Sequence, residues 1–221
     1  MTVIKARDLG KTYGDDVILE GVSFEARSGE SIAFVSPSGS GKSTLLSMMG
    51  LLLSPTTGTV VVDGQDVSDL DDRALSILRR TIFGFVFQHT QLVGSLRARE
   101  NVEAPARFER ARGLPFSLSE RAAHLLEEVG LEDRQDHFPF QLSIGQKRRV
   151  ALARALMLDP PVVIADEPTN DLDGESARSV ADRLFQRTEE GGILLFATHD
   201  LELAARADRV MRLQGNAFVE D

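Results

Sequence analysis

The 221-residue sequence contains no cysteine, no tryptophan and one tyrosine. The absence of cysteine excludes disulfides and thiolate metal ligands, and it is compatible with a reducing compartment. Long apolar runs are missing as well, because the densest one, LLSMMGLLL at 45–53, is far too short to cross a bilayer. The first fourteen residues lack the apolar core of a signal peptide. We therefore expect a chain that does not itself span a membrane.

Basic residues are outnumbered, with 25 Lys and Arg against 34 Asp and Glu, which gives a net charge of −9. No basic stripe stands out, so the sequence argues against nucleic acid as the main partner. Hydrophobic residues make up 42% of the chain, an ordinary value for a globular protein. The length fits one sizeable domain, or one domain that carries an inserted subdomain.

Several short apolar runs lack the alternation of a half-exposed strand and end in polar residues. This pattern predicts a mainly parallel sheet covered on both faces. The runs are 31–35, 82–88, 161–167 and 192–200. A further stretch at 56–67 alternates around Asp63-Gly64, a turn signal.

Between residues 88 and 161, the sequence pattern becomes typical of helices. Ser117 and Glu120 form the pattern of a capping box, and Gly130 is a typical helix stop. We predict further helices over 42–53, ending before Pro55, and over 146–158. A helical insertion at approximately 89–159 would thus divide an α/β core made of 1–88 and 160–221. The arginines at 107, 110 and 112 are expected on a solvated face.

The stretch VSPSGSGKST at 35–44 follows a predicted strand and opens a predicted helix. It fits the phosphate-binding pattern G-x-x-x-x-G-K-[ST] except that Ser36 takes the first glycine position. Backbone N–H groups in such a loop wrap phosphate oxygens, and the following helix adds its positive N-terminal end. The alternative to a phosphate-binding loop is a Ser/Gly-rich turn that contains a lysine without a binding role. The predicted nucleotide-binding residues here are Ser36, Pro37, Ser38, Gly39, Ser40, Gly41, Lys42, Ser43 and Thr44.

An acidic pair, Asp166-Glu167, ends the apolar run at 161–167. Ligands of open α/β sheets bind at the carboxyl ends of the strands, so these side chains are expected in the binding crevice. Asp166 and the Ser43 hydroxyl suit Mg²⁺, which prefers oxygen ligands. Glu167 would orient or deprotonate an attacking water.

The segment QLSIGQKRRVALARAL precedes the acidic pair, and its LSIGQ resembles the LSGGQ signature of ABC ATPases. Nearly the whole chain follows the motif order of that family. The resemblance implies an adenine-stacking aromatic, a glutamine that senses Mg²⁺ and water, a dimer-contact aspartate and a switch histidine. These positions are Tyr13 in KTYG, Gln88 in FVFQ, Asp173 in NDLD and His199 in FATHD. From its residue type alone, Tyr13 could instead be a core tyrosine.

The resemblance also implies an α/β P-loop NTPase fold: a RecA-like core with an N-terminal antiparallel β subdomain and the inserted helical subdomain. It implies hydrolysis of ATP to ADP and phosphate with Mg²⁺, in a head-to-tail pair of chains. Ser143, Gly145 and Gln146 would then contact the nucleotide of the partner chain. The implied catalytic residues are Glu167, His199, Lys42 and Gln88, and the implied metal-binding residues are Ser43, Gln88 and Asp166.

The motif flanks are most similar to ATPases of lipoprotein-release and macrolide-exporter type transporters. This implies a homodimer with a membrane permease subunit of few transmembrane helices, held peripherally at the cytoplasmic face of the inner membrane. Two alternatives stay open. One is a slow or regulatory ABC ATPase that signals to an envelope or cell-division partner. The other is a soluble ABC protein acting on DNA, ribosomes or iron–sulfur assembly, which the single cassette and the acidic balance disfavour.

Three positions that are usually glycine in the family carry Ser36, Ile144 and Asn170, and Asp171 stands in place of an asparagine. If any of these sites required a positive φ, a non-glycine residue would cost about 1–3 kcal/mol. Ile144 would be the worst of them, because it is β-branched and adds bulk beside a phosphate. We therefore expect any slowing of hydrolysis to originate first at Ile144 and second at Ser36.

Overall fold

The computed structural model describes residues 1–37, 39–108 and 117–220. Ser38 of the predicted loop and the arginines 110 and 112 of the predicted solvated face lie outside these ranges. The larger sheet runs, in spatial order, through β10 (Ala217–Glu220), β9 (Arg209–Gln214), β3 (Ser31–Val35), β8 (Ile193–Thr198), β7 (Val162–Asp166) and β6 (Phe83–Val86). All neighbouring pairs are parallel except β10 with β9. The predicted parallel sheet is confirmed.

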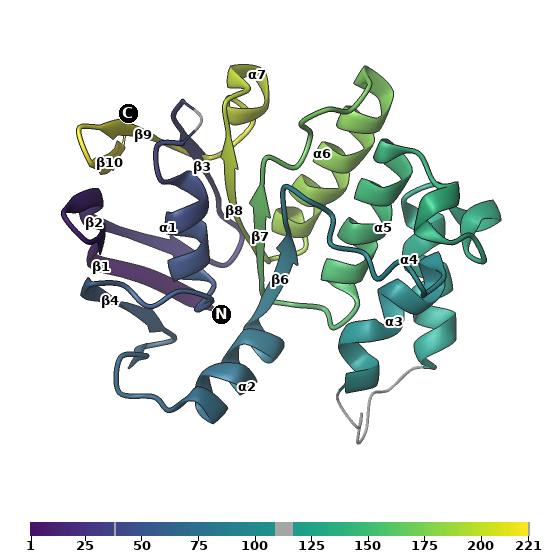
Figure 1. Cartoon of the computed structure of the whole chain (residues 1–221), viewed down its shortest axis with the longest axis horizontal. Coiled ribbons are helices and arrows are strands. Elements are labelled where there is room, and N and C mark those ends of the chain that lie inside the picture. Colours follow the sequence, from purple (N-terminus) through teal and green to yellow (C-terminus); the bar gives the residue numbers. More distant parts are fainter. Residues whose placement is uncertain (38, 109–116, 221) are drawn as a thin grey trace.

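A smaller antiparallel sheet lies at the left of Figure 1. Its strands are, in order, β2 (Asp16–Arg27), β1 (Val3–Tyr13), β4 (Thr57–Val62) and β5 (Gln65–Asp66). The predicted turn joins β4 to β5, with positive φ at both Asp63 (49°) and Gly64 (83°). Two such residues give the turn the twist that an antiparallel hairpin needs.

Successive residues of the parallel strands face two different cores. Ile32 and Phe34 of β3 pack toward the smaller sheet and α1 (Lys42–Met49), which lies between the two sheets in Figure 1. Ala33 and Val35 face the opposite core, where the helices lie. Both faces of the sheet are therefore buried, which explains why its strands read as continuous apolar runs.

Helices cover the second face of the sheet, as Figure 1 shows at its right side. Helices α5 (Ile144–Leu156) and α6 (Gly174–Glu189) pack against its strands, whereas α3 (Ala98–Phe108) and α4 (Leu118–Glu128) pack against α5. The remaining helical elements are α2 (Asp72–Ile82), α7 (Leu201–Ala204) and the short 3₁₀ turns η1 (Glu132–Arg134) and η2 (Pro139–Gln141). Helices α3 to α5 fall within the predicted insertion at 89–159, whose boundaries stay a prediction.

Helix ends differ from the predictions at two places. Helix α1 ends at Met49 rather than near residue 53, because Leu51 has a positive φ of 59° and takes the backbone out of the helix. Helix α5 begins two residues earlier than predicted, because Ser143 and Gln146 form a capping box at its N-terminus. At α4, the Ser117 hydroxyl accepts from the Glu120 amide at 3.5 Å, as half of the predicted box. Within the described part of the chain, no helix combines the length and apolar character needed to cross a bilayer.

Candidate functional site

The loop between β3 and α1 holds Lys42 folded into its own turn. The Lys42 side chain is buried, and its Nζ donates to the carbonyl oxygens of Ser36 (2.7 Å) and Pro37 (3.1 Å). The hydroxyls of Ser36 and Ser40 are hydrogen-bonded to each other, and Ser40 Oγ also donates to the Pro37 carbonyl at 2.6 Å. The residue at the first glycine position therefore closes the loop through its side chain.

Gly41 is a position in this loop where glycine is required. Its φ is +99°, and an added Cβ would lie 3.0 Å from Ile18 Cγ2 and 3.2 Å from Leu19 on β2. A side chain here would meet both backbone strain and a steric clash. The backbone of Gly41 thus caps α1 and sets the entry of the loop into the helix.

The acidic pair lies at the carboxyl end of β7, beside the loop. Ser43 Oγ donates to Asp166 Oδ2 at 2.6 Å. Burial raises the pKa of Asp166, and the Ser43 hydrogen bond and the charge of Lys42 oppose that rise. Asp166 Oδ1 is buried and has no hydrogen-bond partner among the described residues. A carboxylate oxygen held without a donor, next to a serine hydroxyl, has the chemistry of an Mg²⁺ ligand set.

Glu167 is fixed by a hydrogen bond of its backbone amide and by contacts of both its carboxylate oxygens. It is buried, its amide donates to the Ala197 carbonyl at 2.9 Å, and its φ is +46°. Its Oε1 lies 3.4 Å from Lys42 Nζ, and its Oε2 lies 2.9 Å from His199 Nδ1. The contact with a carboxylate favours the tautomer in which Nδ1 carries the proton, and the imidazole is half-exposed.

One pocket of about 270 Å³ gathers half of the predicted residues, and His199 is not among those that line it. It is lined by Tyr13, Ile18, Gly39, Gly41, Lys42, Ser43, Thr44, Gln88, Asp166 and Glu167. Tyr13 is 52% exposed, which excludes the alternative that it is a core tyrosine. The Lys11 ammonium lies 5.1 Å from the centre of the Tyr13 ring. An aromatic rim, a cationic loop and carboxylates at the far side make a pocket suited to a nucleotide and its cation.

The signature residues do not join this pocket within the described chain. Ser143 is the exposed N-cap of α5, and its hydroxyl accepts from the Gln146 amide at 3.2 Å. Gly145 packs against α6, where an added Cβ would lie 2.8 Å from Ser176 Oγ. Asp173 caps α6 by accepting from the amides of Glu175 (3.1 Å) and Ser176 (2.9 Å).

The expected backbone strain at the departures from glycine is absent. Among the described residues with positive φ, neither Ser36, Ile144 nor Asn170 occurs. Ile144 is the first residue of α5 and is 60% exposed, so its backbone is helical. Positive φ values occur instead at two non-glycine residues of the segment after β7, Glu167 (46°) and Asp171 (60°). The condition for backbone strain, a positive φ, is therefore not met at Ile144, and what remains there is the bulk of its side chain.

The family model of ABC transporters matches residues 19–170, more than half of the chain. The chain belongs to the ABC transporter family. Its ATP-binding cassette is 42% identical over 99% of its length to the macrolide export ATP-binding/permease protein MacB of Escherichia coli K12. The corresponding protein of Hyphomonas neptunium is 43% identical, again over 99% of this chain. The alignments span 34% of both relatives, so the chain corresponds to about a third of their length.

Solved structures of ABC cassettes confirm the fold. The dimeric cassette MJ0796, described as a bacterial ABC transporter cassette and also in a post-hydrolysis state with ADP and Pi, superimposes with a TM-score of 0.91 at 37% identity. That match covers 99% of this chain and 97% of the other. CbiO1 of Clostridium perfringens superimposes with a TM-score of 0.85 at 28% identity, covering 98% and 86%. The chain is thus an ATPase cassette with the predicted architecture.

Two residues beside the pocket of this ABC ATPase were not among those predicted from sequence. Ile18 of β2 lines it and packs against Gly41. Arg148 of α5 is buried and donates to the carbonyl of Gln88 at 2.6 Å. A signal for Arg148 was present, because it shares the buried face of its helix with Leu152 and Ala155, where a charged residue needs a partner.

Proposed function

We propose that this ABC ATPase hydrolyses MgATP between two copies of itself and couples that cycle to a separate membrane subunit. One observation carries the proposal. The pocket contains the phosphate loop, Gln88 and the acidic pair, whereas Ser143 and Gly145 lie outside it on the N-terminal end of α5. A second chain, docked head to tail, would bring its own α5 to that pocket, and two such contacts close a two-fold dimer.

The bonds of Lys42 and Glu167 define their roles in this cycle. Lys42 would exchange the carbonyls of Ser36 and Pro37 for phosphate oxygens, and the loop amides would surround the same phosphates. Glu167, fixed by His199 and Lys42, would accept a proton from the attacking water or orient it. His199 and Lys42 then face the charge that develops on the transferred phosphoryl group.

Asp166, Ser43 and Gln88 would hold the cation. Mg²⁺ in such a site neutralises charge on the phosphates and fixes their geometry. The partnerless Oδ1 of Asp166 and the neighbouring Ser43 hydroxyl offer it oxygen ligands. Gln88 is exposed two residues after β6 and lines the pocket, where its side chain would contact the cation and the attacking water.

A complementation experiment tests the shared site. Lys42→Ala removes the loop cation, and Ser143→Arg places bulk at the exposed end of α5, so each variant alone should be inactive. In a mixture of equal amounts, half of the dimers are mixed and each has one intact site. The mixture should therefore recover about a quarter of the wild-type ATPase rate. A mixture as inactive as its components, with both chains folded, would refute a site built from two chains.

The dimer itself is tested with Glu167→Gln, which keeps the pocket but removes the carboxylate. With MgATP this variant should be trapped as a pair by light scattering, because hydrolysis is what releases the partner. Adding Lys42→Ala to it should leave the chain monomeric. If Glu167→Gln with MgATP stays monomeric, both alone and with its membrane partner, the head-to-tail dimer is contradicted.

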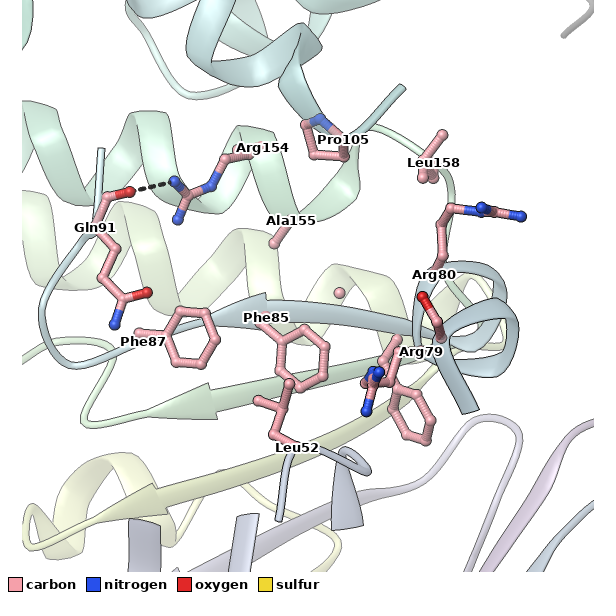
Figure 2. Close-up of a pocket in the computed structure, with 13 residues that line it drawn as sticks. Leu52, Arg79, Arg80, Phe85, Phe87, Gln91, Pro105, Arg154, Ala155 and Leu158 are labelled. Atoms are coloured by element: carbon pink, nitrogen blue, oxygen red, sulfur yellow. Dashed lines mark hydrogen bonds between the residues drawn. The ribbon is translucent and has the colours of Figure 1, made fainter. Parts of the chain in front are cut away.

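A second cavity, of about 450 Å³, offers a docking place for the membrane partner (Figure 2). It lies between the parallel sheet and the inserted helices. Phe83, Phe85 and Phe87 form a row along it, with ring centres 6.0 Å and 5.5 Å apart. Arg154 at the upper side of the figure donates to carbonyls at 2.8 Å. An apolar floor with cationic edges suits a short amphipathic helix of a membrane protein.

Matched substitutions separate this docking from ATP binding. Leu52 lines the cavity and is 46% exposed, and Val219 on β10 is 43% exposed at a remote place. Leu52→Glu should release the chain from membranes of its source cells, where we place it at the cytoplasmic face, whereas Val219→Glu should not. Both should keep the wild-type affinity for ATP. Equal release by the two variants would remove the cavity from the proposal.

On this proposal, the partner is a permease with few transmembrane helices. The similarity to macrolide export ATP-binding/permease proteins supports a permease as the partner. The alternative of a slow, regulatory ATPase rests on the bulk of Ile144 at the face that would meet the partner nucleotide. Steady-state hydrolysis in the presence of the membrane subunit decides between them. A rate no greater than that of Glu167→Gln would favour the regulatory function.

A further inference from the structure

Arg148 joins three segments of the chain at one guanidinium. It lies on α5 and is 3% exposed. Its Nη1 donates to the carbonyls of Phe87 (2.9 Å) and Gln88 (2.6 Å), which follow β6. Its Nη2 reaches the Asn170 carbonyl at 3.4 Å, in the loop that follows β7 and Glu167. One side chain of the helical region thus contacts two of the segments that carry predicted catalytic residues, those of Gln88 and Glu167.

The described hydrogen-bond partners of this buried cation are all backbone carbonyls. Burial lowers the pKa of Arg148, and the nearby charges of Asp171 and Asp166 offset part of that effect. A guanidinium stays protonated inside a protein. Its charge is therefore stabilised chiefly by the dipoles of the carbonyl groups that accept its hydrogen bonds. If either loop moves away from α5, the buried guanidinium of Arg148 loses a carbonyl that accepts one of its hydrogen bonds. The two loops and the helix are therefore expected to move together.

A second arginine of the same helix separates the roles of the contacts. Arg154 donates from Nη2 to Thr90 and from Nη1 to Gln91, each at 2.8 Å, and Figure 2 draws the Gln91 contact. The two arginines together hold the carbonyls on both sides of His89 against α5. Of the two, only Arg148 is also hydrogen-bonded to the loop after Glu167. The hydrogen-bonded link between α5 and the loop that follows β7 and Glu167 therefore runs through Arg148.

We infer that Arg148 is a positioning residue that makes the placement of Gln88 depend on the position of α5. The inference rests on the proposed function, since α5 carries Ser143 at the end that would meet the nucleotide of the partner chain. Docking of the partner would set α5, and α5 would set the Gln88 backbone through Arg148. Gln88 would then reach the cation and the water only when the second chain is in place.

The test compares Arg148→Gln with Arg121→Gln. Arg121 is a matched control, because it also donates to backbone carbonyls, those of Leu156 and Met157, but far from the pocket. Arg148→Gln should lower kcat by about tenfold or more while KM for ATP stays within about threefold, since the phosphate loop and Tyr13 are untouched. It should also raise the Mg²⁺ concentration for half-maximal rate. Arg121→Gln should change none of these by more than about twofold.

A double-mutant cycle decides whether Arg148 acts through Gln88. In a Gln88→Ala background, Arg148→Gln should lower kcat by less than about twofold further, because the group it positions is already gone. Multiplication of the two full effects would overturn the inference, as would an Arg148→Gln enzyme indistinguishable from the control. If Arg148→Gln does not fold, Arg148→Lys carries the same test, since a single ammonium cannot span both loops.

The outcome for this inference is separable from that for the proposed function. If the Lys42→Ala and Ser143→Arg mixture regains no activity, the shared site fails and Arg148 loses its proposed purpose. If the mixture is active and Arg148→Gln behaves like Arg121→Gln, the shared site stands and only the positioning role falls.

Discussion

Gly84 on β6 is the place where one added methyl group would disturb the cassette most directly. A Cβ there would lie 2.7 Å from Pro160 Cγ and closer still to the carbonyl oxygen of Ala155, well inside the 3.4 Å at which ordinary contact begins. The nearest obstacle is backbone in α5, so no side-chain rotation relieves it. Gly84→Ala must therefore push α5 away from the sheet.

The cost follows from the packing at this position. Overpacking a well-filled core costs typically about 1–3 kcal/mol, and an obstacle of backbone atoms places this substitution near 3 kcal/mol. For a chain of this size, that corresponds to a fall in Tm of roughly 6–12 °C. Urea denaturation followed by circular dichroism should give the lower free energy of unfolding with an unchanged m-value.

Gly94→Ala supplies the control, because an added Cβ at this exposed glycine meets no atom within 4 Å and its φ is not positive. It should leave stability within about 0.5 kcal/mol of the wild type, or raise it slightly by restricting the unfolded chain. A loss at Gly84→Ala below about 0.5 kcal/mol, or equal to that of the control, would refute the packing argument. It would mean that α5 is free to move from β6, and the coupling of α5 to Gln88 would weaken with it.

Three further outcomes are expected. The hydroxyls of Ser68 and then Thr59 lower the pKa of Asp66 from 3.8 to about 2, so the stability this carboxylate contributes is present above pH 3.8 and is lost as the pH falls toward 2. After allowance for solvent screening, Asp66→Asn should cost about 1 kcal/mol at pH 7 and nothing near pH 2 in urea titrations; a pH-independent cost would contradict this. Tyr13→Ala should raise KM for ATP about tenfold and Tyr13→Phe less than twofold, by loss of stacking on adenine, and equal effects would remove the stacking role. Ile144→Gly should lower the free energy of unfolding by up to about 1 kcal/mol, because the helix loses a better helix former and gains no relief from strain, and a stabilised variant would show that strain was present after all.

The parallel sheet could be predicted because burial on both faces leaves a plain pattern in the sequence. Of the smaller sheet, only the stretch at 56–67 could be predicted from its own pattern, and the other strands entered only through the family resemblance. Its long strand β1 is interrupted by register shifts between Ala6 and Leu9 and again near Lys11, and Asp8 has a φ of +48°. These irregularities break the alternation from which an antiparallel strand is recognised.

The phosphate loop and the acidic pair could be located from sequence because each lies directly after a strand of the sheet. Their mutual bonds could not, since Ser43 and Asp166 are 123 residues apart and meet only in the folded chain. The partners of Arg148 could not be predicted for the same reason, because they follow two other strands. Local patterns thus identify the groups that carry chemistry, while the residues that position them depend on tertiary contacts.

The strain in this site is concentrated at the predicted base rather than at the departures from glycine. Glu167 keeps a left-handed backbone although it is not glycine, and it does so because its amide is bonded to Ala197 and its carboxylate to Lys42 and His199. Ser36 and Ile144 bear no such strain, so neither reduces turnover through the backbone. Any slowing by Ile144 must come from its exposed side chain at the end of α5, where it would matter only once a second chain is docked. A defect of that kind lowers the rate of the dimer and leaves ATP binding by the single chain intact, which separates it from a decayed phosphate loop.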